Sequence, residues 1–185
     1  MDAMDTARAA LDAAHLNDPA GPAGERQYAD LIEAWIARLV SAPSPELQLA
    51  ARAQHLERWA IPRADYPEGR GGYLRWRAAV HKRQGDRAQE ILGAAGCDPA
   101  LTARVAALVS KAAPRGDAEA QALEDAACLV FLETEFADFA AQYSREKTID
   151  VLRKTWRKMS EGGHEAAARL TLAPELAALV AEAVR

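Results

Sequence analysis

Two histidines and one aspartate are the residues of this chain best suited to hold a metal ion. His55, His81 and Asp125 lie on three different predicted helices, and imidazole and carboxylate groups together bind Mn, Fe, Zn or Ni. A bound divalent ion would lower the pKa of its water ligand and produce a nucleophile at neutral pH. The sequence therefore predicts a metal centre, although its residues lack the tight spacing of a His-Glu-x-x-His motif. The alternative is that each histidine is a hydrogen-bonded core residue.

Glu124 is the candidate catalytic residue beside this metal centre. It precedes Asp125 on a predicted helix that is broadly apolar. A buried carboxylate needs a cation, a metal or a hydrogen-bond donor, because an unpaired buried charge is costly. We therefore expect Glu124 to orient a ligand or to move protons.

Arginine and tyrosine residues are concentrated around the segment 62–73. Nine Arg and Lys residues stand against four Asp and Glu residues between positions 52 and 87, although the whole chain has a net charge of −4. Guanidinium groups pair bidentately with phosphate and carboxylate, so this basic zone indicates an anionic ligand. The residues predicted to bind it are Arg52, Arg58, Arg63, Tyr66, Arg70, Tyr73 and Arg77. The alternative is a solvated face whose arginines pair with Glu57, Asp65 and Glu68.

Other chemistries lack their motifs. No serine lies in a G-x-S-x-G elbow, and the segment 69–72 lacks the Lys-Ser/Thr ending of a P-loop. Cys128 has apolar neighbours in the middle of a predicted helix, which favours a packing role. His15 follows the first predicted helix, where we expect a cap or a surface residue.

The composition favours an all-α fold, with residues 1–185 forming a single domain of about seven helices. Half of the residues are hydrophobic, alanine is abundant, and alternating Val/Ile/Thr patterns are nearly absent. No apolar run approaches the roughly 18 residues of a membrane span, and the N-terminus lacks the pattern of a signal peptide. The two cysteines have no CxxC spacing. We therefore expect a cytoplasmic protein with no membrane partner.

The expected helices run over residues 2–14, 24–40, 45–59, 72–91, 98–110 and 117–143, with another from 144 and a short closing helix from 174. On the third of these, Arg52, His55 and Trp59 would form one ridge, because residues three and four apart share a helix face. We expect this helix to pack against the helix over 117–143. That packing would bring His55 within reach of Glu124 or Asp125.

Four stretches resemble a family known from bacteria and fungi as a domain of unknown function. They are ARAQHLERWAIPR, YPEGRGGYLRWR, QALEDAACLVFLE and KTWRKMS, and the likeness covers nearly the whole chain. The resemblance implies an all-α protein and brings no activity with it.

The chain is also distantly similar to the HD-domain superfamily of metal-dependent phosphohydrolases. In that similarity His55 corresponds to the first member of the His-Asp pair and Asp125 to the late Asp, whereas Leu56 stands in the place of the paired Asp. The position of the early His holds Glu25 or Tyr28.

These patterns lead to one main functional hypothesis and two alternatives. The main hypothesis is an HD-like hydrolase that uses a divalent metal on a phosphorylated or otherwise anionic small molecule or nucleotide. With a pair of irons the same ligands would indicate a di-iron oxygenase. The alternative from another class is a non-catalytic module whose Arg/Tyr/Trp loop binds a nucleotide or RNA by stacking and phosphate contacts.

Overall fold

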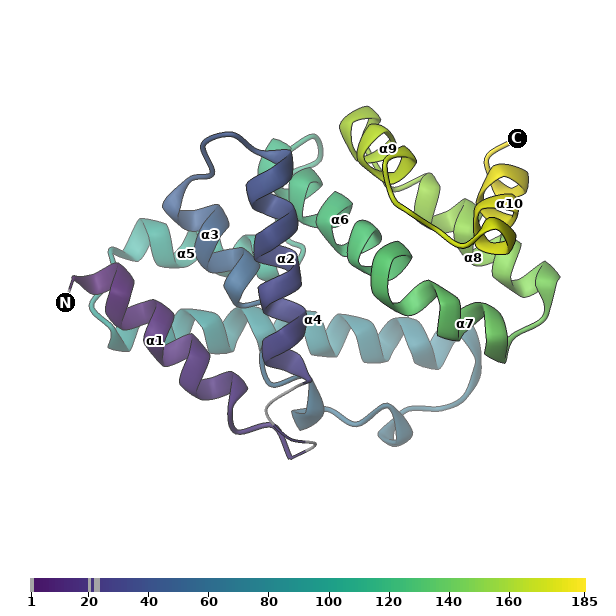
Figure 1. Ribbon diagram of the computed structural model, residues 1–185. Coiled ribbons are helices and arrows are strands. Elements are labelled where there is room, and N and C mark those ends of the chain that lie inside the picture. The colour runs from purple at the N-terminus through teal and green to yellow at the C-terminus, as the bar shows by residue number, and fades with distance from the viewer. Residues whose placement is uncertain (1, 20, 22–23) are drawn as a thin grey trace.

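The computed structural model describes residues 2–19, 21 and 24–185, and within these ranges every regular element is a helix (Figure 1). This confirms the all-α class. The α-helices are α1 Ala3–His15, α2 Glu25–Leu39, α3 Pro45–Arg52, α4 Gly69–Ala94, α5 Pro99–Val109, α6 Ala118–Val130, α7 Phe136–Gln142, α8 Arg145–Trp156, α9 Glu161–Ala168 and α10 Pro174–Ala183. There are more than the seven expected, because the segments 117–143 and 145–168 each form two helices.

Side-chain caps fix where most of these helices begin. The Ser44 hydroxyl accepts the backbone N–H of Leu47, and Pro45 occupies the first helical position of α3. Asp98 accepts the N–H groups at the start of α5 in the same way, again followed by a proline. Asp2, Asp117, Ser144 and Ser160 cap α1, α6, α8 and α9.

The core forms where α2 packs between α3 and α6, while α4 runs along α5 (Figure 1). The largest fully buried apolar side chains are Leu11, Ile32, Ile36, Leu47, Leu49, Leu56, Leu92, Leu108, Leu123, Leu129 and Phe136. Full burial of each such side chain contributes roughly 1.5–3 kcal/mol. Gly85 allows α4 and α5 to lie close together, since a Cβ atom there would be 2.9 Å from the carbonyl oxygen of Ala106.

The helix predicted over 45–59 is shorter than expected, because α3 ends at Arg52. The chain then turns twice through the left-handed region, at His55 (φ 60°) and at Glu57 (φ 48°). Neither residue is a glycine or an asparagine, the types that most often mark a left-handed turn in a sequence. It is held by tertiary contacts: Glu57 accepts hydrogen bonds from Arg83 and Arg87 on α4. The predicted ridge of Arg52, His55 and Trp59 is therefore wrong.

The helix predicted over 117–143 is also interrupted. α6 widens into a π-helical turn, Phe131–Glu135, before α7 begins. The Thr134 hydroxyl donates to the carbonyl of Val130 at 2.8 Å, and Glu133 accepts the indole N–H of Trp35 at 2.8 Å. The wide turn thus joins this segment to α2.

None of the helices in the described part of the chain combines the length and the apolar character needed to cross a membrane.

Candidate anion-binding pocket

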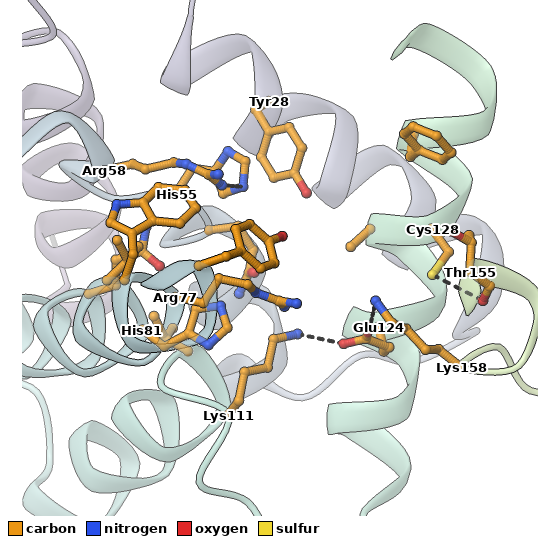
Figure 2. Close-up of a pocket in the computed structure, with 18 residues that line it drawn as sticks. Tyr28, His55, Arg58, Arg77, His81, Lys111, Glu124, Cys128, Thr155 and Lys158 are labelled. Carbon is orange, nitrogen blue, oxygen red and sulfur yellow. Dashed lines mark hydrogen bonds and ion pairs between the residues drawn. The ribbon is translucent and has the colours of Figure 1, made fainter. Parts of the chain in front are cut away.

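A cavity of about 230 Å³ lies between α2, the turn after α3, α4, α6 and α8 (Figure 2). Its charged and imidazole side chains are Arg58, Arg77, Lys111, Lys158, Glu124, His55 and His81. Aromatic rings, including those of Tyr28, Tyr73, Trp76 and Phe131, complete much of the wall. Segments distant in the sequence therefore supply one basic, partly aromatic pocket.

Arg58 enters the pocket from the short 3₁₀ turn Arg58–Ala60. Its guanidinium lies over the ring of Trp76, 4.9 Å from the centroid, and its Nη1 is 2.8 Å from Nε2 of His55. The Trp76 indole in turn donates to the carbonyl of Ile61 at 2.9 Å, which fixes the ring under the cation. Among the described residues, Arg58 forms no ion pair with a carboxylate within 4.0 Å.

Arg77 reaches the same pocket from α4 and lies one helical turn beyond Tyr73. Its guanidinium is 5.9 Å from the centroid of the Tyr73 ring. Within the described ranges, Arg77 likewise lacks a carboxylate partner at ion-pair distance. The charges of Arg58 and Arg77 are therefore available to a ligand.

Glu124 contributes the pocket's single carboxylate among the described lining residues, and two lysines share it. Lys111 Nζ lies 3.1 Å from one oxygen and Lys158 Nζ lies 3.5 Å from the other (Figure 2). Burial opposes ionisation of Glu124, but the two ammonium groups outweigh it and hold its pKa below the usual value. Four cations thus face one carboxylate, and the pocket carries an excess of positive charge.

The two histidines add no charge near neutral pH. Burial, followed by the charges of the nearby Arg77 and Lys111, lowers the pKa of His81 to about 4. Burial, followed by the charge of Arg58, holds the pKa of His55 well below 6.5. Both side chains are therefore neutral imidazoles, each with one ring nitrogen that donates a hydrogen bond and one that accepts.

Gln84 supplies a polar group without a partner. It lines the pocket from α4 and is 4% exposed, and its buried Nε2 has no hydrogen-bond partner among the described residues. A buried donor left unpaired costs about 1–3 kcal/mol. An acceptor on a ligand, or water, in the cavity would remove that cost.

The pocket brings together six of the residues singled out by the sequence. They are His55, Arg58, Tyr73, Arg77, His81 and Glu124. His55 and Glu124 both line this cavity, and a direct or bridged contact between them stays a prediction. Tyr66 and Arg70 do not line it. Arg63 belongs to the loop, where its guanidinium donates to the carbonyls of Tyr66 and Pro67.

The placement of Arg52 in the anion site is wrong. Its side chain is 1% exposed and pairs with Asp12, Asp30 and Glu33, away from the cavity. The guanidinium is buried at the centre of an ion cluster whose acids are partly exposed, so its donors are already used. His15 is also buried, contrary to the expected cap or surface role, and its Nε2 lies 2.8 Å from the carbonyl oxygen of Arg52.

Asp125 does not meet the two histidines. Its carboxylate accepts hydrogen bonds from the side-chain amide of Gln121 and from the backbone N–H and the hydroxyl of Ser160. It is absent from the pocket wall. Within residues 2–19, 21 and 24–185, no three His, Cys, Asp or Glu side chains are grouped as metal ligands would be. The predicted ligand set of His55, His81 and Asp125 therefore does not fit a metal ion.

Sequence reasoning missed several residues of the pocket. Tyr28 was noted only at the early-His position of the HD-domain similarity, whereas in the structure its ring stacks on His55. Lys111 follows the C-cap of α5, and nothing in the local sequence marks it as functional. Lys158 falls in the KTWRKMS stretch, which carried a weak basic signal. Cys128 lines the pocket as a thiol, because burial raises its pKa to about 12.

These features define an all-helical protein with a small, positively charged, partly aromatic pocket. The chain belongs to the family described as domain of unknown function DUF4202, whose model matches residues 5–180. This agrees with the resemblance to a domain of unknown function found in the sequence. Comparison with curated proteins and with solved structures gives no match.

Proposed function

We propose that this protein binds a compact anionic metabolite, such as a phosphate monoester, in the pocket between α2, α4, α6 and α8. The observation that carries the proposal is the charge balance: four cations against one carboxylate, with Arg58 and Arg77 free of carboxylate partners among the described residues. Several like charges gathered in one cavity repel one another, and an anion would relieve that repulsion.

The size of the cavity favours a small ligand. Pockets for drug-sized molecules span about 300–1,000 Å³, whereas this one holds about 230 Å³. A chain of nucleotides would need an open groove with successive stacking platforms. The cavity is enclosed on several sides by helices, so it supports a phosphorylated small molecule better than an RNA segment.

Metal-dependent hydrolysis and di-iron oxygen chemistry are not part of this proposal, because the ligand set predicted for them does not converge. Hydrogen bonding by the chain's own side chains fits the pocket better. With a pKa of about 4, the His81 imidazole is unprotonated at neutral pH and can accept a hydrogen bond from a bound hydroxyl. The charge of Arg77 beside it would hold the substrate's anionic group.

The test is direct binding of anions by isothermal titration calorimetry. Inorganic phosphate, glycerol phosphate, ribose 5-phosphate and AMP would be titrated into the wild type, Arg58→Gln and Arg77→Gln. We expect at least one of these ligands to bind, and each substitution to weaken it at least tenfold, because one charge-assisted contact is worth about 1.5–3 kcal/mol.

Arg75→Gln is the matched control, because Arg75 lies on the same helix but is exposed and outside the pocket. It should leave the affinity within twofold of the wild type. Equal affinities for all four proteins, or no binding of any anion at millimolar concentration, would overturn the proposal.

A further inference from the structure

The structure constrains both the backbone and the imidazole ring of His55. Its backbone is in the left-handed region (φ 60°), which costs energy for a residue other than glycine. Its ring stacks on Tyr28 with the centroids 3.6 Å apart and the planes within 4° of each other. Two independent features, one in the backbone and one in the ring, therefore fix this imidazole.

The neighbours of the ring also fix its tautomer. Arg58 Nη1 can only donate, so Nε2 of His55, 2.8 Å away, must accept. In the neutral ring the proton is then on Nδ1, which lies 3.5 Å from a carboxyl oxygen of Glu25. Arg58, His55 and Glu25 thus form a directed chain that runs from the pocket to the start of α2.

Arg58 is therefore held from two sides. Trp76 supports the face of the guanidinium, and His55 occupies one of its N–H groups. The other N–H groups are left for a ligand. An arginine that is already oriented loses less side-chain freedom when it binds an anion, and this raises its affinity.

We propose that His55 is a positioning residue, which accepts a hydrogen bond from Arg58 and so aims the Arg58 guanidinium at the anionic group of the ligand. This inference rests on the proposed anion binding. It assigns to His55 a role other than metal ligation. It also explains why a strained backbone is retained beside the pocket.

A double-mutant cycle separates positioning from direct contact. Sulfate is the probe, because its charge stays constant over the pH range of interest. The variants are His55→Asn, Arg58→Gln and the double variant; asparagine is chosen because it tolerates the left-handed region. We expect His55→Asn to weaken sulfate binding about tenfold when Arg58 is present and to have no further effect in the Arg58→Gln background.

His81→Asn provides the comparison, since His81 lines the same pocket and the hydrogen bond of Arg58 goes to His55 instead. Its effect should be the same in both backgrounds. Equal losses for His55→Asn with and without Arg58 would overturn the positioning role. If Arg58→Gln itself leaves sulfate affinity unchanged, the proposed function fails instead, and the two failures are thus distinguishable.

The spectrum of ¹⁵N-labelled histidine gives a second readout that a purely structural role would not affect, and it decides the matter if His55→Asn does not fold. We expect His55 to be the Nδ1–H tautomer with an unprotonated Nε2, and its Nε2 resonance to shift when sulfate binds. An Nε2–H tautomer, or an Nε2 resonance that sulfate does not move, would contradict the inference.

Discussion

The carboxylate of Asp125 accepts both the backbone N–H and the hydroxyl of Ser160, and so ties the middle of α6 to the start of α9. We predict that Asp125→Asn destabilises the protein, because the amide N–H₂ group would replace an acceptor oxygen and face the hydrogen-bond donors of Ser160 or Gln121. The cost should be about 1–3 kcal/mol. Thermal unfolding measures it. Sulfate affinity should not change, because Asp125 lies outside the pocket; a loss of affinity at unchanged stability would contradict this assignment.

Two neighbouring glycines of α9 should respond oppositely to alanine. A Cβ atom at Gly163 would lie 2.8 Å from the carboxylate of Asp125, whereas one at Gly162 would meet its nearest neighbour at 3.8 Å. We expect Gly163→Ala to cost about 1–3 kcal/mol and Gly162→Ala to stabilise α9 by about 0.5–1 kcal/mol. Urea unfolding of both variants checks the pair. Equal shifts would mean that α9 does not dock on Asp125 as described.

Arg52 should be essential for stability and irrelevant to anion binding. Arg52→Met would leave Asp12, Asp30 and Glu33 without their shared cation. Removing one partner of a buried ion pair costs about 3–5 kcal/mol, and the partial exposure of these acids places the loss near the lower limit. The measurements are unfolding free energy and sulfate affinity. If a folded Arg52→Met variant bound sulfate more weakly than the wild type, Arg52 would contribute to anion binding, and this prediction would be wrong.

Glu25 should make the protein less stable as the pH rises. Burial raises its pKa from 4.5 to about 7, so between these pH values the folded state binds more protons than the unfolded state. Stability therefore falls across this window, by about 3 kcal/mol in all for this group. Glu25→Gln should remove that loss, and it keeps an oxygen toward His55. Urea unfolding at pH 5 and pH 8 tests this; parallel losses in both proteins would refute it.

Anion binding should be accompanied by proton uptake at His81. Burial first, and then Arg77 and Lys111, lower its pKa to about 4. A bound anion offsets those two cations, so the pKa rises and, near pH 5, a proton enters with the ligand. Titrations with sulfate at pH 5 in buffers of different ionisation enthalpy measure the uptake. It should be absent at pH 8 and absent in His81→Asn. Uptake that persists in that variant would place the proton elsewhere.

The sequence alone was sufficient for the class of fold and for several helix starts. Ser44-Pro45 and Asp98-Pro99 predict helices at the correct positions, because capping and the fixed φ of proline are local effects. The basic zone was also visible, and two of its arginines, Arg58 and Arg77, do line the pocket. Local chemistry thus located the elements and part of the lining.

Only the tertiary structure decided how the charges pair. Arg52 and Arg58 are six residues apart and chemically identical, but the left-handed turns at His55 and Glu57 separate them. Arg52 pairs with three carboxylates, whereas Arg58 faces the cavity. Those turns are stabilised by Tyr28, Arg83 and Arg87, which are distant in sequence, so no local pattern could reveal them.

The roles of Glu124 and Asp125 show the same limit on a smaller scale. Adjacent residues of an α-helix point about 100° apart, so the two acids can meet different neighbours. Periodicity places both acids on α6, but it does not say which neighbour each will meet. Packing decides: Glu124 lies between Lys111 and Lys158 in the pocket, whereas Asp125 holds Ser160.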